Sequence, residues 1–205
     1  MIVKICGITN REDALAAAEA GASALGFIFY PDSRRYILPD TAALIAEAVP
    51  KTVWKVGVFV NEQPERVAEV AALAGLDVVQ LVGPAGHPSG APVPHLRLWR
   101  ALPVGPDFRL SQLEAWPEAE ALVLDTAVPG RYGGTGQTFP WELARGATRK
   151  VILAGGLHAG NVREAIRAAR PWGVDASSSL ETAPGVKSHA RVAAFIAAAL
   201  AEAES

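Results

Sequence analysis

Short apolar segments recur along this chain, with room for one helix between most neighbouring pairs. The segments that we assign as strands cover residues 2–6, 24–29, 54–60, 78–82, 121–125, 150–154 and 173–176. Strands that are apolar on both faces are typical of parallel sheets, because helices cover such sheets and keep both faces away from water. The sequence therefore predicts a repeated βα unit.

The segments between these strands carry signals for helices. Asn10 is a candidate N-cap with acidic residues in the turn that follows, and prolines occupy first-turn positions at 39 and 64. We expect longer helices to start at residues 11, 39 or 40, 64, 161 and 189, and shorter ones to cover 110–116 and 139–146.

Residues 83–94 depart from this rhythm. Four prolines stand there where a helix is due, so we expect a loop, with the helix between the fourth and fifth strands lost or shortened. The next segment, 96–102, is compatible with a helix or a strand. We assign it as the fifth strand, because eight strands then complete an α/β fold of the minimal (β/α)8 TIM barrel type, as one domain over residues 1–205.

Composition narrows the functional classes. Apolar residues make up 50% of the chain, which suffices for one large core, and the net charge of −2 provides no basic surface for nucleic acid or an anionic membrane. We see no membrane span or export signal, and a single cysteine excludes an internal disulfide, so we expect a cytoplasmic protein. The four histidines are scattered without ligand spacing, so we assign no metal site.

Two strand ends predict a phosphate site. Gly155 and Gly156 follow the seventh strand, and Ser177 and Ser178 follow the eighth. Glycines let backbone N–H groups approach a ligand without obstruction by a Cβ atom, and a helix that starts just beyond favours an anion. If the two strands are neighbours, both loops converge on one phosphate group.

In barrels of this type, the reactive groups lie at the carboxyl ends of the strands. This filter selects Cys6 at the end of the first strand, Arg35 after the second, Gln80 in the fourth and Asp125 at the end of the sixth. A thiol, a guanidinium and a carboxylate beside a phosphate grip can move protons on a phosphorylated, anionic substrate without a metal.

Each of these features also has a purely structural interpretation. A lone cysteine at a strand end, such as Cys6, is more often a small buried apolar residue than a base, and Asp125 can organise a turn. Arg35 can be a solvated surface charge, and the glycine-rich stretch 133–136 is by itself most often a flexible loop. Their coincidence at one face of a barrel favours the functional interpretation.

Taken together, these stretches resemble the phosphoribosylanthranilate isomerase family, whose members are small (β/α)8 barrels of tryptophan biosynthesis. The matching segments follow the family order from residue 3 to the closing helix; they are Val3-Lys4-Ile5-Cys6-Gly7-Ile8-Thr9, Gly26-Phe27-Ile28-Phe29, Ser33-Arg34-Arg35-Tyr36, Val56-Gly57-Val58-Phe59-Val60-Asn61, Gln80-Leu81-Val82-Gly83, Leu124-Asp125-Thr126, Gly133-Gly134-Thr135-Gly136, Ala154-Gly155-Gly156-Leu157 and Gly173-Val174-Asp175-Ala176-Ser177-Ser178.

The resemblance implies an aldose-ketose isomerase that needs no cofactor. Its reaction is the Amadori rearrangement of N-(5-phosphoribosyl)anthranilate to 1-(2-carboxyphenylamino)-1-deoxyribulose 5-phosphate. The resemblance implies that Asp125 is the general acid for the ring oxygen, that Cys6 is the general base for the C2′ proton, and that Arg35 binds the anthranilate carboxylate. The remaining substrate-binding positions that it implies are Gln80, Gly134, Gly155, Gly156, Ser177 and Ser178.

Three positions depart from the family pattern. Val82 stands where the family commonly has histidine, Ser179 stands where a glycine usually follows the two serines, and Arg34 replaces a proline. The last departure leaves open whether Arg34 or Arg35 faces the substrate.

Other functions are compatible with part of this pattern. An indole-glycerol-phosphate synthase would need additional lysines and glutamates at strand ends, and a pentose-phosphate epimerase would need histidines placed for a metal. A non-catalytic phosphometabolite-binding barrel would keep the phosphate grip alone, and the presence of both Cys6 and Asp125 weighs against it. We expect a small phosphorylated molecule as partner, and a monomer or homodimer.

Overall fold

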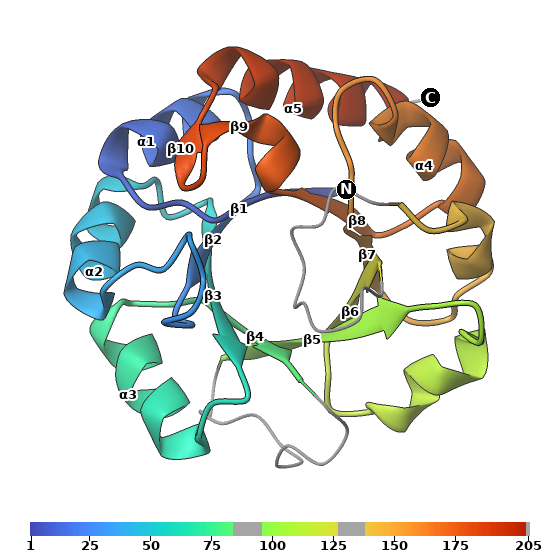
Figure 1. Ribbon diagram of the computed structural model, residues 1–205, viewed down its shortest axis with the longest axis horizontal. Coiled ribbons are helices and arrows are strands. Elements are labelled where there is room, and N and C mark those ends of the chain that lie inside the picture. Colours follow the sequence, from blue (N-terminus) through green and yellow to red (C-terminus); the bar gives the residue numbers. More distant parts are fainter. Residues whose placement is uncertain (84–95, 127–137, 204–205) are drawn as a thin grey trace.

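Eight parallel strands close into a barrel with its helices outside (Figure 1). The structure, a computed structural model, describes residues 1–83, 96–126 and 138–203. The strands are Ile2–Cys6 (β1), Ala24–Ile28 (β2), Trp54–Val60 (β3), Val78–Val82 (β4), Arg97–Val104 (β5), Ala121–Thr126 (β6), Val151–Leu153 (β7) and Gly173–Ala176 (β8). The predicted TIM barrel is confirmed, including the assignment of the fifth strand.

The helices follow the predicted order. They are Arg11–Glu19 (α1), Pro39–Ala48 (α2), Pro64–Leu73 (α3), Val162–Ala169 (α4) and His189–Ala203 (α5). The two short helices are 3-10 turns, Leu110–Ala115 (η1) and Trp141–Ala144 (η2). The prediction of a lost helix between β4 and β5 concerns residues 84–95, which lie outside the described residues.

Local chemistry explains where the first helices begin. The Asn10 side chain accepts a hydrogen bond of 2.8 Å from the backbone N–H of Asp13, so Asn10 caps α1 as predicted. Pro39 and Pro64 are the first residues of α2 and α3, where the missing N–H of proline leaves no helical hydrogen bond unmade.

The sequence analysis did not foresee the segment after β8. A 3-10 turn, Ser178–Leu180 (η3), leads into an antiparallel hairpin of Glu181–Ala183 (β9) and Val186–Lys187 (β10). This β9–β10 hairpin lies beside β1 and α1 in Figure 1. It brings two charged residues, Glu181 and Lys187, into the buried part of the protein.

The barrel interior is apolar at the amino ends of the strands. Three indole rings, those of Trp54, Trp99 and Trp172, lie with their centroids 6.0–6.2 Å apart. Arg97 and Lys150 cover two of these rings, at 4.3 and 4.8 Å from the ring centroids. This tryptophan plug closes one end of the barrel.

The interior becomes polar toward the carboxyl ends. Along β1, Ile2 packs against the apolar interior cluster, whereas Lys4 and Cys6 follow at the next two inward positions. The polar carboxyl end of the barrel is therefore where we expect a site.

All described helices are too short or too polar to cross a membrane.

Candidate active site

Cys6 ends β1 and is buried, with 8% of its surface exposed. A Cβ atom placed on Gly26 of β2 would lie 2.7 Å from the Cys6 sulfur and 3.1 Å from Cε of Lys4. Only glycine leaves room for both side chains at this point of the neighbouring strand. The thiol and the lysine chain are therefore packed side by side against β2.

Lys4 and Asp175 form an ion pair across β1 and β8. Their Nζ and Oδ2 atoms are 2.7 Å apart, and their side chains are only 0% and 9% exposed. The two residues are register partners in the barrel, so both side chains point inward at the same level. The other carboxylate oxygen, Oδ1 of Asp175, has no hydrogen-bond partner within the described residues.

Within this ion pair, Lys4 opposes the effect of burial on the pKa of Cys6, whereas Asp175 adds to it. Burial raises the pKa of the Cys6 thiol, while the positive charge of Lys4 acts to lower it. Burial alone would lower the pKa of Lys4, but Asp175 and Cys6 together outweigh it, through charge and hydrogen bonding, and raise that pKa. Lys4 is thus held as a cation beside the thiol.

Asp125 of β6 is a weaker acid than an ordinary aspartate. Burial, and after it the negative charge of Asp175, raises the pKa of Asp125 to about 6. A hydrogen bond of 2.8 Å from the Thr126 N–H to Oδ1 acts in the opposite direction. At pH 7 about one Asp125 carboxyl group in ten therefore keeps its proton, against about one in a thousand at the ordinary pKa, and a general acid requires this protonated form.

Gly155 lies directly against this carboxyl group. A Cβ atom there would be 2.7 Å from Oδ1 of Asp125 and 2.5 Å from Oγ1 of Thr126, and the residue has a φ of +82°. Both the close approach and the backbone conformation require glycine. The glycine that the sequence analysis selected for a phosphate thus also makes room for the predicted acid.

The loops after β7 and β8 are neighbours, as the phosphate hypothesis required. The two strands pair directly, with Leu153 opposite Val174. The hydroxyl of Ser179 donates to the carbonyl of Leu157 and so joins the two loops. Ser179, where the family usually has glycine, therefore adds a side-chain link that glycine cannot make.

Two more hydrogen bonds hold these loops in place. The Asn161 side-chain amide donates to the carbonyl of Gly156 at 3.0 Å, immediately before α4. The hydroxyl of Ser177 donates to the carbonyl of Cys6 at 3.0 Å and ties the β8 loop to β1. Ser178 begins η3 and is half-buried.

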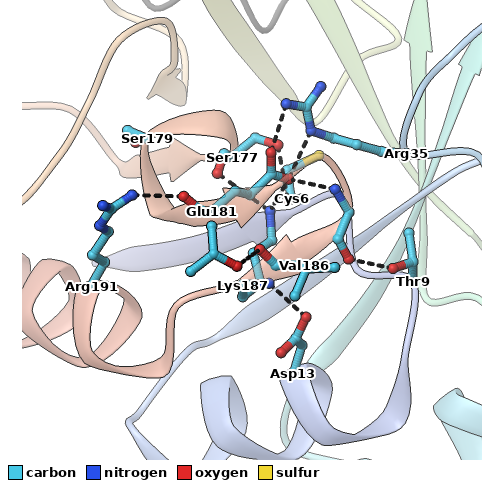
Figure 2. A network of polar contacts seen from close by, with 12 residues as sticks. Cys6, Thr9, Asp13, Arg35, Ser177, Ser179, Glu181, Val186, Lys187 and Arg191 are labelled. Atoms are coloured by element: carbon cyan, nitrogen blue, oxygen red, sulfur yellow. Dashed lines mark hydrogen bonds and ion pairs between the residues drawn. The ribbon is translucent and has the colours of Figure 1, made fainter.

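Arg35 lies over the end of β1, whereas Arg34 is exposed. The Cδ atom of Arg35 would be 2.6 Å from a Cβ atom on Gly7, and the Arg35 guanidinium pairs with Glu181 of the β9–β10 hairpin (Figure 2). The sequence left open which of the two arginines faces the substrate. In the fold, Arg35 is the one that lies at the carboxyl end of the barrel.

Gln80 and its neighbour Val82 lie on the opposite wall. Gln80 of β4 is buried, and in the part of the chain that the structure describes its Oε1 atom accepts no hydrogen bond. Val82, in place of histidine, packs beside the apolar interior cluster. Gly134 lies outside the described residues.

Three residues of the site were not predicted from the sequence: Asp175, Glu181 and Lys187. A signal for the first was present, since Lys4 and Asp175 are single charges inside otherwise apolar strands, and β1 and β8 become neighbours when a barrel closes. No group of three His, Cys, Asp or Glu residues suited to a metal ion occurs among residues 1–83, 96–126 and 138–203.

The fold and the site define a (β/α)8 barrel with a buried thiol and a carboxyl group of raised pKa at the carboxyl ends of its strands. The family model described as N-(5'phosphoribosyl)anthranilate (PRA) isomerase matches residues 3–198. The N-(5'-phosphoribosyl)anthranilate isomerase of Solibacter usitatus (strain Ellin6076) is 48% identical over 204 residues, which are 98% of each chain.

Solved structures agree with this match. The crystal structure of phosphoribosyl anthranilate isomerase from Thermotoga maritima is similar with a TM-score of 0.89 and 42% identity, over 98% of this chain and 100% of the other. A structure of such an isomerase in complex with reduced 1-(o-carboxyphenylamino)-1-deoxyribulose 5-phosphate has a TM-score of 0.86 and 39% identity, over 98% and 100%. The chain belongs to the N-(5'-phosphoribosyl)anthranilate isomerase family.

Proposed function

We propose that this protein isomerises N-(5'-phosphoribosyl)anthranilate to 1-(o-carboxyphenylamino)-1-deoxyribulose 5-phosphate, as a step of tryptophan biosynthesis. The observation that carries this proposal is the shared electrostatic environment of Cys6 and Asp125 within a chain of this family. Both groups feel the buried Lys4–Asp175 pair, but the charge of Lys4 has the larger effect on the pKa of Cys6, which it lowers, and the charge of Asp175 has the larger effect on the pKa of Asp125, which it raises. Lys4 favours a thiolate at Cys6, and Asp175 favours a protonated carboxyl group at Asp125.

In the proposed mechanism, Asp125 gives its proton to the furanose ring oxygen. The C1′–O bond then breaks, and the nitrogen lone pair forms an iminium at C1′. The iminium acidifies the C2′ proton, which the Cys6 thiolate removes to give an enolamine. Tautomerisation of the enolamine, with a proton gained at C1′ and the 2′ hydroxyl proton lost, gives the ketone.

The rest of the mouth binds the two ends of the substrate. Arg35 holds the carboxylate of the anthranilate ring through its planar guanidinium. The loops at Gly155, Gly156, Ser177 and Ser178 hold the phosphate, and the bond between Ser179 and Leu157 supports this arrangement by keeping the two loops together. Gln80 and Gly134 complete the proposed contacts.

We further propose one cytoplasmic barrel domain over residues 1–205, active as a monomer or homodimer. The homodimer is the alternative that a relative supports, because one structure concerns monomers made from the dimeric enzyme of Thermotoga maritima. Sedimentation velocity over a hundredfold concentration range separates the two states, since only a dimer dissociates on dilution.

The test of the proposed function is turnover of freshly generated phosphoribosylanthranilate by the purified protein, followed by the change in anthranilate fluorescence. We expect enzyme-dependent conversion that a metal chelator leaves unchanged. Binding of the substrate without conversion would favour the non-catalytic phosphometabolite-binding barrel instead. Loss of activity with the chelator, restored by added metal, would favour an epimerase-like enzyme.

A further inference from the structure

Glu181 holds the Arg35 guanidinium in one orientation. Oε1 of Glu181 accepts from Nε at 2.8 Å, and Oε2 accepts from Nη2 at 2.7 Å (Figure 2). The Glu181 side chain is only 4% exposed. A bidentate carboxylate fixes the plane of the guanidinium as well as its position, because both groups are flat.

The β9–β10 hairpin that carries Glu181 is itself anchored at several points. Lys187 of β10 donates to Oε1 of Glu181 at 2.9 Å and to the carbonyl of Ser177 at 3.3 Å. The Lys187 backbone N–H donates to Asp13 of α1 at 2.8 Å, and Arg191 of α5 donates to the Glu181 carbonyl at 2.6 Å. Glu181 is therefore a fixed support for Arg35.

The charges of this cluster leave room for one more anion. Burial acts to raise the pKa of Glu181, but hydrogen bonds from Arg35 and Lys187 outweigh it and lower that pKa. One carboxylate between two cations leaves a charge of +1 on these three residues while the neighbouring Cys6 is a neutral thiol. The guanidinium has five N–H groups, and Glu181 uses one on each of two nitrogens, so a further carboxylate can still bind to the others.

We infer that Glu181 is a positioning residue that aims Arg35 at the ring carboxylate of the substrate and thereby sets the selectivity for carboxylated ligands. The inference rests on the proposed function. Glu181 does not touch the substrate in this account. It acts by keeping the free edge of the Arg35 guanidinium turned toward the barrel mouth.

The test compares two ligands that differ only in the ring carboxyl group. One is reduced 1-(o-carboxyphenylamino)-1-deoxyribulose 5-phosphate, and the other is the same molecule with an unsubstituted phenyl ring. Calorimetry gives the ratio of their dissociation constants for the full chain and for Glu181→Gln. We expect the variant to lower the preference for the carboxylated ligand about tenfold, the size of one charge-assisted hydrogen bond. The phenyl ligand should bind within about twofold of wild type.

A matched control is available on the outside of the barrel. Arg167 of α4 and Glu202 of α5 make the same bidentate pair, at 2.8 and 2.7 Å. Glu202→Gln should leave the selectivity ratio unchanged. In an Arg35→Ala background, Glu181→Gln should also leave the ratio unchanged, because Glu181 then has no guanidinium to orient.

Three outcomes would overturn the inference. One is an unchanged or increased preference for the carboxylated ligand in folded Glu181→Gln, and another is an equal loss of affinity for both ligands. The third is a loss of selectivity that persists without Arg35. If Glu181→Gln does not fold, Glu181→Asp, which keeps the charge and shortens its reach, is measured in the same way. Failure of wild type to turn over substrate would instead reject the proposed function.

Discussion

The two ends of the barrel interior are built from the same strands but differ in chemistry. At the amino ends, the plug of Trp54, Trp99 and Trp172 fills the barrel with apolar surface. At the carboxyl ends, the buried ion pair of Lys4 and Asp175 takes up space that apolar side chains could fill. Burying the two charges costs free energy, and their attraction offsets only part of that cost, whereas burying indole rings stabilises the fold.

The residues that stabilise the fold and the residues proposed for the chemistry therefore lie at opposite ends of the barrel axis. A substitution at the tryptophan end should change the free energy of unfolding and leave the chemical step alone. A substitution at the charged end should slow the chemical step without lowering the free energy of unfolding, and should in some cases raise it. Four predictions test this separation.

The largest effect on turnover is expected from the proposed acid and base. Cys6→Ala and Asp125→Asn should each lower kcat by about 10²- to 10⁴-fold, the usual contribution of a positioned acid or base. Inorganic phosphate should still bind, since the proposed grip lies on β7 and β8. Steady-state kinetics and competition with phosphate check both statements; wild-type turnover in either variant would reject the proposed roles.

The largest effect on stability is expected from the plug. Trp99 is fully buried, so Trp99→Ala should lower the free energy of unfolding by about 3–5 kcal/mol. Its Nε1 atom has no hydrogen-bond partner within the described residues, so Trp99→Phe loses no hydrogen bond and should cost much less. Urea unfolding measures both values, and kcat at low temperature should stay within about twofold of wild type. A large loss of kcat in folded Trp99→Phe would break the separation.

Asp125 should make the folded state less stable as the pH rises. Its pKa is about 6 in the folded protein against an ordinary value of 3.8, so between these values the folded state binds more protons than the unfolded one. Stability is therefore lost as the pH rises from about 4 through about 6. Asp125→Asn should be more stable than wild type by about 3 kcal/mol at pH 8 and no more stable near pH 4. Equal stability at pH 8 would contradict the assigned pKa.

The smallest effect is expected from the glycine beside the acid. Gly155→Ala should displace the Asp125 carboxyl group and lower kcat about tenfold, because a Cβ atom would approach Oδ1 to 2.7 Å. Gly146→Ala is the matched control, since Gly146 has nearly the same φ, +81°, and its Cβ position has nothing within 4 Å. Both variants should lose some stability through strain, and only Gly155→Ala should lose kcat. A similar kcat in the two would show that Gly155 serves the backbone alone.

The sequence predicted the barrel well because its strands are local features. β1, β3, β4 and β8 match the predicted bounds, since each is a mainly apolar run, with one polar or charged residue inside it, that ends where further polar residues or glycine begin. β5 was ambiguous, and the need for an eighth strand decided its assignment. The N-cap at Asn10 was also predictable, because its hydrogen-bond partner, Asp13, is only three residues away.

The electrostatic partners of the site were harder to predict, because they are distant in sequence. Arg35 and Glu181 are 146 residues apart, and Lys4 and Asp175 are 171 apart. The stretch from Glu181 to Lys187 contains Pro184 and Gly185 and indicates a loop, so nothing local identifies Glu181 as a buried carboxylate. Likewise, the pKa of Asp125 depends on burial and on Asp175, which only the closed barrel brings near.

The proposed acid catalysis depends most directly on the protonation of Asp125. Carbon-13 NMR of the aspartate carboxyl carbons, with Asp125→Asn to assign the signal, measures this titration in the folded protein. We expect a midpoint of about 6 for Asp125. A midpoint at or below the ordinary aspartate value of about 4 would leave almost no acid at neutral pH and would reject Asp125 as the general acid.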